Sequence, residues 1–576
     1  MKQIIHPAHI IRLTTLIFFL CSGVYSQAQH YYKSVQNQGE QSQDILDTIW
    51  LRYDLKNMLF WHLAATPAKQ TEPGMFPEME YTGELVTGYN RAKLAWYFID
   101  PLFYDTTGNL RPDNVGPDNL SDPMARQVRE DELFPDKSFP NGNPSNMPIL
   151  NLAYYPIERG PYNFDTHGVE GISEGIKSNG ELKAPESRWG GITRKIEKYP
   201  FGNEPEKLVS LSFWLMDPFI DNHETGGDLY FNFGDISEDV MCDSKMFFEQ
   251  GIQDPEIPGN NDFSIWGLVP VSLPVTQNFN QHINREIQDA GMDGMRNNLE
   301  IDFFNDYLSN IEALYEDTSL AYQQALADPS ADDFHYFRGS DFDEDTLYSS
   351  IIERYKQYNG TDGNSPTDSQ NPELYPTAAT TIPDSEDLNY DRLLNEEENY
   401  YQYKIRLHPD EMQAGMNYID QVQHATGIEL PNGENTECTW CHFNIPLETH
   451  ENVFGDPPPF DSCGLIRMFL KGFSEPVVLR FGSMELNRIR NNPRFFDIAV
   501  NPNPADTYFK IEFGELVKNN FEFTLTDIFG RTALKEYFET QSYYEYRLDV
   551  SDIKPGFYAL TVSTPDFRFV KKVYVK

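Results

Sequence analysis

The side chains of this sequence best suited to chemistry are its cysteines, the histidine beside two of them, and its many acids. Cys438, Cys441 and His442 form a C-x-x-C-H pattern, in which two thiols would add to the vinyl groups of a haem and the imidazole would ligate its iron. The pattern lies in TWCHFNIP, whose alternation indicates a strand, whereas haem attachment sites usually open a helix. We therefore predict no covalent haem.

The same cysteines are better suited to a disulfide. Cys242, Cys438, Cys441 and Cys463 follow the export signal described below, and an exported chain meets an oxidising environment. Adjacent strands would bring Cys463 near Cys438 or Cys441, although four cysteines allow three pairings. A zinc site that adds His442 lacks a second spaced pair of ligands. The sequence favours a disulfide and leaves its pairing open.

Two groups of acids have a spacing that suits general acid–base catalysis or calcium. They are Asp235, Glu238 and Asp239, and Asp341, Asp343 and Asp345. Ca²⁺ prefers such oxygen ligands, but the chain has 89 Asp and Glu, so these groups arise from composition alone. We expect solvated acidic faces and no cofactor, with calcium at the Asp341 group as the alternative.

Three further features resemble parts of hydrolases or lectins. Gly171–Gly175 matches G-x-S-x-G around Ser173, but a nucleophile elbow needs a buried strand before it, and no strand pattern precedes it. His223-Glu224 lacks the second histidine of a zinc protease. Trp189 offers a ring for stacking on a sugar, although burial in a core is the commoner fate of such a ring. The sequence therefore favours structural roles for all three.

The elements that position these side chains belong to a strongly acidic chain. It has 45 Lys and Arg against 89 Asp and Glu, a formal net charge of -44. A nucleic acid would be repelled by this charge, so we expect no nucleic-acid partner. Aromatic residues make up 14% of the chain, too many for a disordered acidic tail. The length of 576 residues exceeds the ~250–300 residues at which a single core stops growing.

Residues 1–26 have the features of a signal peptide. Lys2 and Arg12 precede the apolar run Leu13–Leu20, and small residues follow it. We expect cleavage after Ser26 and export. No later stretch reaches the ~18 apolar residues that suggest a membrane-spanning helix, so we expect no transmembrane segment in the mature chain.

Residues 27–84 are weakly patterned, and aromatic-rich strands between Pro/Gly/Asp-rich loops follow them. Strands are expected at 94–99, 208–216, 228–233, 400–407, 439–445, 465–470 and 477–481. They predict a mainly β module, a jelly-roll-like β-sandwich over 85–490. The helical spacing of Phe303, Tyr307 and Ile311 indicates a helical insertion at about 297–358. A long polar loop at 359–391 comes after it.

The last residues, 494–576, have the strand pattern of a small Ig-like β-sandwich. Their motifs resemble the type A C-terminal sorting domain of type IX secretion. The matching residues are Asn501, Pro502, Asn503, Pro504, Gly530, Pro555, Gly556, Lys571 and Lys572; Asn501 replaces the usual aromatic. The resemblance implies recognition by the type IX machinery, passage through the periplasm and the outer membrane, and a final place at the cell surface or outside the cell.

The larger region, 85–490, resembles the gliding-motility and secretion protein SprA, the translocon of the same system. The similarity runs through Thr87–Tyr97, Leu150–Thr166, Arg188–Ile192, Phe213–Phe219, Gly227–Val240, Asp333–Gly339, Tyr355–Pro366, Asn395–Leu407 and Arg467–Arg480. SprA proteins are far longer, and most of their length builds the membrane channel. The resemblance therefore implies the fold of the module and a secretion context, without channel activity.

These features together predict a non-enzymatic exported protein that binds a partner at the cell surface or in the secretion or gliding apparatus. One alternative is a secreted glycan-binding β-sandwich, which would be marked by aromatic rings along an open groove. The other is an exported hydrolase, which would be marked by a deep pocket with paired carboxylates.

Overall fold

The computed structural model describes residues 48–68, 75–105, 110–137, 139, 144–197, 207–220, 225–249, 261–273, 290–358, 383–491, 498–517, 521–527, 531–538, 543–563 and 568–576. The predicted signal peptide, the His223-Glu224 pair, most of the polar loop at 359–391 and Gly530 lie outside these residues. The chain divides into two compact units. The larger spans Trp50–Arg490, and the smaller includes Asn491–Lys576.

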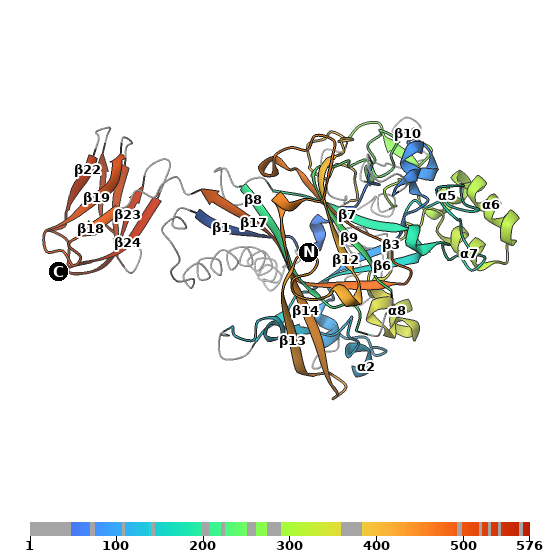
Figure 1. Ribbon diagram of the computed structural model, residues 1–576, viewed down its shortest axis with the longest axis horizontal. Coiled ribbons are helices and arrows are strands. Elements are labelled where there is room, and N and C mark those ends of the chain that lie inside the picture. Colours follow the sequence, from blue (N-terminus) through green and yellow to red (C-terminus); the bar gives the residue numbers. More distant parts are fainter. Residues whose placement is uncertain are drawn as a thin grey trace, which may run out of the picture. The chain divides into compact units, whose positions relative to one another are not determined.

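Two sheets of mainly antiparallel strands build the larger unit (Figure 1). The first has the order β13-β14-β8-β17-β6-β3, with β1 also paired to β17. Its strands are β1 (Thr48–Asp54), β3 (Ala92–Tyr97), β6 (Leu150–Arg159), β8 (Lys207–Met216), β13 (Ile419–Glu429), β14 (Asn435–Pro446) and β17 (Val477–Asn491). The second has the order β15-β12-β9-β16-β7-β2. Its strands are β2 (His62–Leu63), β7 (Trp189–Lys195), β9 (Gly227–Asp235), β12 (Asn399–Leu407), β15 (Asn452–Phe454) and β16 (Leu465–Lys471).

The main core lies between these two sheets. Phe213 of β8 and Phe231 of β9 belong to opposite sheets, and their ring centroids are 5.7 Å apart. The outer face of the first sheet is covered as well, since Tyr97 of β3 stacks on Tyr355 of α9 (Ile351–Tyr355). Because strands such as β8 are buried on both faces, their sequences are continuous apolar runs rather than alternating ones.

Helices fill the segment where helical spacing predicted them. They are α5 (Asn297–Phe303), α6 (Asn305–Tyr315), α7 (Leu320–Ala327), α8 (Ser340–Glu344) and α9. Figure 1 shows α5, α6 and α7 gathered at one end of the unit. α7 begins after Ser319, whose hydroxyl accepts the backbone N–H of Tyr322 at 3.2 Å as an N-cap. The predicted helical insertion is confirmed as a set of short helices.

The larger unit also contains shorter helices and strands outside its two main sheets. The short helices α2 (Pro117–Leu120) and α3 (Glu130–Leu133) lie between β3 and β6 in the chain. Two short antiparallel pairs are formed by β4 (Val128–Arg129) with β5 (Asn146–Met147), and by β10 (Asn261–Phe263) with β11 (Leu268–Pro270).

The smaller unit is a second sandwich. One sheet has the order β18-β19-β22 and the other β21-β20-β23-β24. The strands are β18 (Ile498–Asn501), β19 (Tyr508–Val517), β20 (Phe521–Asp527), β21 (Thr532–Phe538), β22 (Tyr543–Asp549), β23 (Gly556–Ser563) and β24 (Arg568–Val575). Phe523 of β20 stacks on Tyr546 of β22 across the two sheets at 5.1 Å. The predicted fold class, mainly β with sandwich-like sheets in both units, is confirmed.

Candidate functional site

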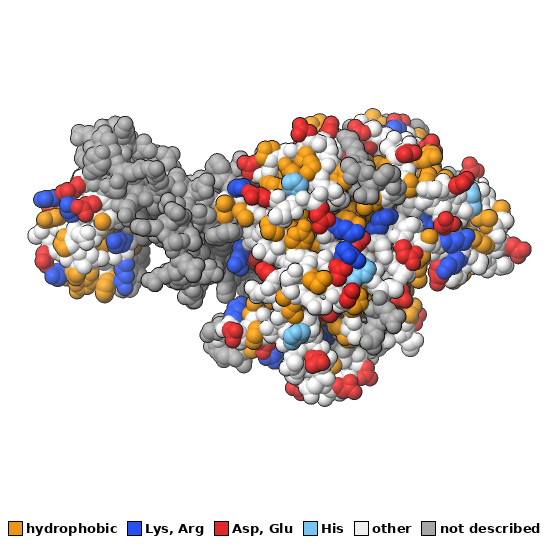
Figure 2. Space-filling model, viewed as in Figure 1, with side chains coloured by type: hydrophobic (Ala, Val, Ile, Leu, Met, Phe, Trp, Pro, Cys, Tyr) orange, Lys and Arg blue, Asp and Glu red, His pale blue; other side chains and the backbone are white. Residues whose placement is uncertain are grey.

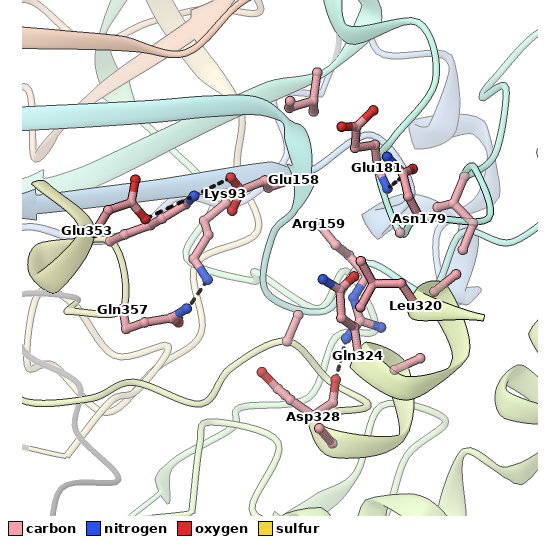
Figure 3. Close-up of a pocket in the computed structure, with 18 of the residues that line it drawn as sticks. Lys93, Glu158, Arg159, Asn179, Glu181, Leu320, Gln324, Asp328, Glu353 and Gln357 are labelled. Carbon is pink, nitrogen blue, oxygen red and sulfur yellow. Dashed lines mark hydrogen bonds and ion pairs between the residues drawn. The ribbon is translucent and has the colours of Figure 1, made fainter. Parts of the chain in front are cut away.

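A pocket of about 570 Å³ lies where the helices meet β3 and β6 (Figure 3). β3 contributes Lys93 to its wall, and the end of β6 contributes Glu158 and Arg159. α7 and α9 close the other sides. Leu320 at the start of α7 and Leu347 before α9 are more than half exposed at this lining. The pocket therefore combines polar strand residues with an apolar rim.

Two cations of the wall have neutral partners. The Nζ of Lys93 donates to the side-chain oxygen of Gln357 at 3.0 Å, and burial lowers the pKa of Lys93. Arg159 donates to the carbonyl oxygens of Pro329, at 2.9 Å, and Asp328, and to the Tyr307 hydroxyl. Neither cation forms an ion pair with a residue that the structure describes. An acidic or carbonyl group of a ligand would therefore find two donors here.

The remaining charges of the wall are paired with one another. Lys356 lies 2.5 Å from Glu158 and 3.6 Å from Glu353, and its Nζ is 4.8 Å from the centre of the Tyr155 ring. These ion pairs join β6 to α9 and fix that side of the pocket. No sequence motif marks this site, although Lys93, Glu158 and Arg159 all lie in segments that carry the SprA resemblance.

The C-x-x-C-H pattern lies on strand β14, as predicted. Cys438 and Cys441 are three positions apart, so their side chains point to opposite faces of the sheet. Cys438 lies 3.1 Å from Nη2 of Arg126, while Cys441 belongs to the main core. Burial raises the pKa of Cys438 to about 11 and that of Cys441 to about 12. His442 has its Nδ1 2.5 Å from Asp420.

None of the four cysteines that the structure describes is joined to another of them in a disulfide. Cys242, Cys438, Cys441 and Cys463 are all buried. Cys438 and Cys441 cannot meet because they face opposite sides of β14, and Cys463 lies in the core on the same side as Cys441 without bonding to it. Residue type and compartment suggested a disulfide, but the alternation of side chains along β14 separates the sulfur atoms of Cys438 and Cys441.

The hydrolase-like and sugar-stacking candidates have structural roles. Ser173 lies in a turn, where its hydroxyl accepts the backbone N–H of Val169 at 3.3 Å, as the loop interpretation predicts. Trp189 has none of its surface exposed. It packs edge-on against Phe76 and Phe469. Trp189 is therefore a core residue.

The first acidic group is not the solvated face that composition suggested. Glu238 and Asp239 are buried and hold loops together by accepting backbone N–H groups, from Asn389 and Ser244 respectively, each at 2.9 Å. Burial raises the pKa of Glu238 to about 7 and that of Asp239 to about 6. These carboxylates stabilise the loops that follow β9; the third member, Asp235, ends that strand.

In the second acidic group, Asp343 is paired with two arginines. Asp343 forms ion pairs with Arg338 at 2.6 Å and with Arg354 at 2.7 Å, and Asp341 lies 3.2 Å from His335. Asp341 and Asp345 are exposed. The arrangement ties α8 to α9.

Part of the sorting signature meets at the last strand of the smaller unit, whereas Asn501 lies on β18 and pairs with Lys510 of β19. Asn503 donates from its side-chain amide to the Lys572 carbonyl at 3.1 Å, and its side-chain oxygen accepts the backbone N–H of Tyr574 at 2.9 Å. Gly556, which follows Pro555, begins β23 and is the register partner of Val575 on β24. Lys571 and Lys572 lie on β24, and the Lys572 ammonium covers the Phe557 ring at 4.4 Å.

Two family models match the chain. One, described as "Motility related/secretion protein", matches residues 306–520. The other, described as "Secretion system C-terminal sorting domain", matches residues 499–576. The chain joins an SprA-like module to a type IX sorting domain. A comparison with curated proteins gives no match.

The SprA match starts within α6 and includes strands of both sheets of the larger unit. β12, β14, β16 and β17, which lie inside it, pair with β6, β7, β8 and β9, which lie before it. The part of the larger unit inside the match and the part before it therefore share one core.

The sorting domain determines where the protein goes. It indicates recognition by the type IX machinery and export to the cell surface or the extracellular space. Within the described part of the chain, no helix has the length and apolarity needed to cross a membrane. Figure 2 shows acidic and basic side chains interspersed over the visible face of the molecule.

Proposed function

We propose that this protein is a non-enzymatic binding protein of the cell surface or the extracellular space, whose SprA-like module engages a protein partner of the secretion or gliding apparatus. The observation that carries the proposal is the combination in one chain of an SprA-like module with a type IX sorting domain. The sorting domain takes the module to the compartment in which surface components of that apparatus are exposed.

The non-enzymatic part of the proposal is supported by how the reactive groups are used. The thiols of Cys438 and Cys441 are buried with raised pKa values, so they are poor nucleophiles at neutral pH. The Ser173 hydroxyl accepts a hydrogen bond within its own turn. Glu238 and Asp239 hold loops together. Each group has a structural explanation.

The pocket supports a protein partner over a glycan. Its rim residues Leu320 and Leu347 are exposed and apolar, and its wall offers the donors of Lys93 and Arg159. This combination suits a peptide segment with an acidic or carbonyl group. The described tryptophan side chains, by contrast, are all buried: Trp61, Trp96, Trp189, Trp214, Trp266 and Trp440. None of these tryptophan rings is at the surface, where a sugar could stack on it.

The test is capture of the partner from the cell surface. Cells producing wild-type protein and the Lys93→Met variant are treated with a membrane-impermeant cross-linker, and captured proteins are identified by mass spectrometry. We expect one specific secretion or motility protein with wild type and roughly tenfold less with Lys93→Met, because a charge-assisted hydrogen bond is lost. Lys207→Met, which removes an exposed lysine on β8, is the matched control and should capture the wild-type amount.

Two results would contradict the proposal. Enrichment of surface polysaccharide without a protein would favour the glycan-binding alternative. Turnover of a peptide or ester substrate by purified protein, abolished by a substitution in the pocket, would favour an exported hydrolase. Deleting 494–576 tests export separately: the shortened protein should remain in the periplasm, and normal amounts outside the cell would refute the role of the tail.

A further inference from the structure

Five carboxylates converge on the loops beside the pocket. Asp293 precedes α5 and Glu300 lies on it, while Asp328, Asp332 and Asp333 follow α7. Oxygen atoms of Asp293, Glu300 and Asp332 lie within 4.8 Å of one another, and so do those of Asp328, Asp332 and Asp333. Asp332 belongs to both triplets. Asp328 is also labelled in the pocket wall of Figure 3.

Asp332 is the decisive residue of this cluster. Its side chain is buried, at 1% exposure, yet neither of its carboxylate oxygens has a hydrogen-bond partner. One oxygen approaches Gly291 so closely that a Cβ there would lie 2.1 Å from it, and Gly291 has a φ of +80°. The chain therefore brings an unpartnered carboxylate into a buried site, which is costly unless something compensates its charge.

The other two buried acids are held so that they face Asp332. The Ser330 hydroxyl donates to Asp293 at 2.7 Å, and the Ser330 backbone N–H donates to Oε2 of Glu300 at 2.9 Å. Oε1 of Glu300 has no partner. The loop after α7 thus fixes both acids and leaves one Glu300 oxygen and both Asp332 oxygens available in the same small space.

Nearby cations do not compensate these charges. Residues 297–337 contain nine Asp and Glu but no Lys or Arg. Arg159, from another segment, donates to the carbonyl oxygens of Asp328 and Pro329 and to the Tyr307 hydroxyl rather than to a carboxylate. Among the described residues, no ion pair involves Asp293, Glu300 or Asp332. Burial and the neighbouring carboxylates raise the pKa of Asp293 to about 8 and that of Glu300 to about 10.

We propose that Asp293, Glu300 and Asp332 bind a calcium ion. Calcium–oxygen bonds are about 2.3–2.6 Å long, so two oxygens bound to one ion lie at most about 4.6–5.2 Å apart, and the three carboxylates, within 4.8 Å of one another, meet that limit. The donors are carboxylates, without histidine or cysteine, which favours a hard cation over zinc. Calcium also tolerates an irregular set of oxygen ligands, whereas magnesium demands a near-octahedral one.

The ion would lock the helical end of the module. It would join the loop before α5, the body of α5 and the loop after α7. That last loop supplies the Asp328 and Pro329 carbonyls that hold Arg159 in the pocket wall. Exported modules meet calcium at millimolar concentrations, and such sites typically have dissociation constants of about 10⁻⁴–10⁻³ M. Calcium would then order the pocket only after export.

The test uses mature protein, residues 27–576, stripped with a chelator and titrated with Ca²⁺ alone up to about 10 mM. Calorimetric titration should show a single saturable site, and tryptophan-monitored melting should show Tm rising by roughly 3–6 °C. Asp332→Asn should weaken binding at least roughly tenfold.

Further measurements make the outcome decisive. Asp341→Asn removes an acid whose side chain is 62% exposed, and it should bind calcium like wild type. Glu300→Gln replaces Asp332→Asn if that variant does not fold, with the same expected loss. The absence of saturable binding in wild type, or wild-type affinity in both cluster variants, would overturn the proposal. An equal Tm rise with Mg²⁺ would overturn the assignment to calcium.

Discussion

The ion pair between Arg467 and Glu398 at the centre of the second sheet gives the sharpest test of the module's energetics. The two side chains are 0% and 2% exposed, and they meet in a two-pronged arrangement with N–O distances of 2.7 and 2.9 Å. Glu398 also accepts the backbone N–H of Ser237 at 3.2 Å. The pair therefore joins β16, the start of β12 and the loop after β9.

Removing one partner leaves the other as an uncompensated buried charge. We expect Arg467→Met to lower the free energy of unfolding by about 3–5 kcal/mol. The double variant Arg467→Met/Glu398→Leu removes both charges and fills much of the space, so it should lie within about 1–2 kcal/mol of wild type. The double variant should thus be more stable than the single one.

An ion pair at the surface with similar geometry provides a matched control. Arg129 and Asp131 make the same two-pronged contact, at 3.0 and 2.8 Å, but their side chains are 54% and 36% exposed. Arg129→Met should cost at most about 1 kcal/mol, because water screens the pair. Geometry is nearly the same in the two pairs, so the difference between the variants measures the effect of burial.

The assay is denaturant unfolding of the mature chain followed by tryptophan fluorescence. All seven tryptophans lie between residues 50 and 440, so the signal reports on the module and not on the sorting domain. A loss below about 1 kcal/mol in Arg467→Met would refute the reasoning. So would a double variant as unstable as the single one.

Other predictions concern titration, the tail and the thiols. The pKa of Glu238 is 4.5 in the unfolded chain and about 7 in the folded one, so the folded state binds more protons. The free energy of unfolding should therefore fall as the pH rises from about 4.5 to about 7. Glu238→Gln should flatten this fall when unfolding is measured across that pH range. Asn503→Ala removes two hydrogen bonds to β24, so the tail should lose about 1–2 kcal/mol in calorimetry, and Asn503→Asp, which keeps the acceptor, should lose less. Native protein should show no fast-reacting thiols with a disulfide reagent, and denatured mature protein should show four. A count below four would mean that the protein contains a disulfide.

Much of the fold was predictable because the strands carry strong local signals. β8 and β9 are apolar runs bounded by Pro, Gly and Asp, and the helices show a clear 3.6-residue spacing. β13 was missed, because its sequence, IDQVQHATGIE, is mostly exposed at a sheet edge and has few apolar residues to repeat. Edge strands are specified by a neighbour that the local sequence does not reveal.

The pocket was not predictable from local patterns. Lys93 on β3, Arg159 on β6 and Gln357 after α9 come together only because the sheet and the helices pack against each other. Local patterns also left the cysteine pairing open. The alternation of β14 turns Cys438 away from the main core that Cys441 shares with Cys463, and no disulfide joins the described cysteines. Residue type alone cannot supply side-chain direction or long-range contact.

The two acidic groups near the helices show which sequence feature would have helped. Asp341–Asp345 and Asp328–Asp333 are similar in composition, and the spacing of the acids in the first made it the alternative calcium site. Asp343 in the first group is paired with Arg338 and Arg354, whereas the second ends a stretch, 297–337, that has no Lys or Arg. Because buried carboxylates need a compensating charge, the absence of cations in the surrounding sequence indicates a metal site better than the density of acids does.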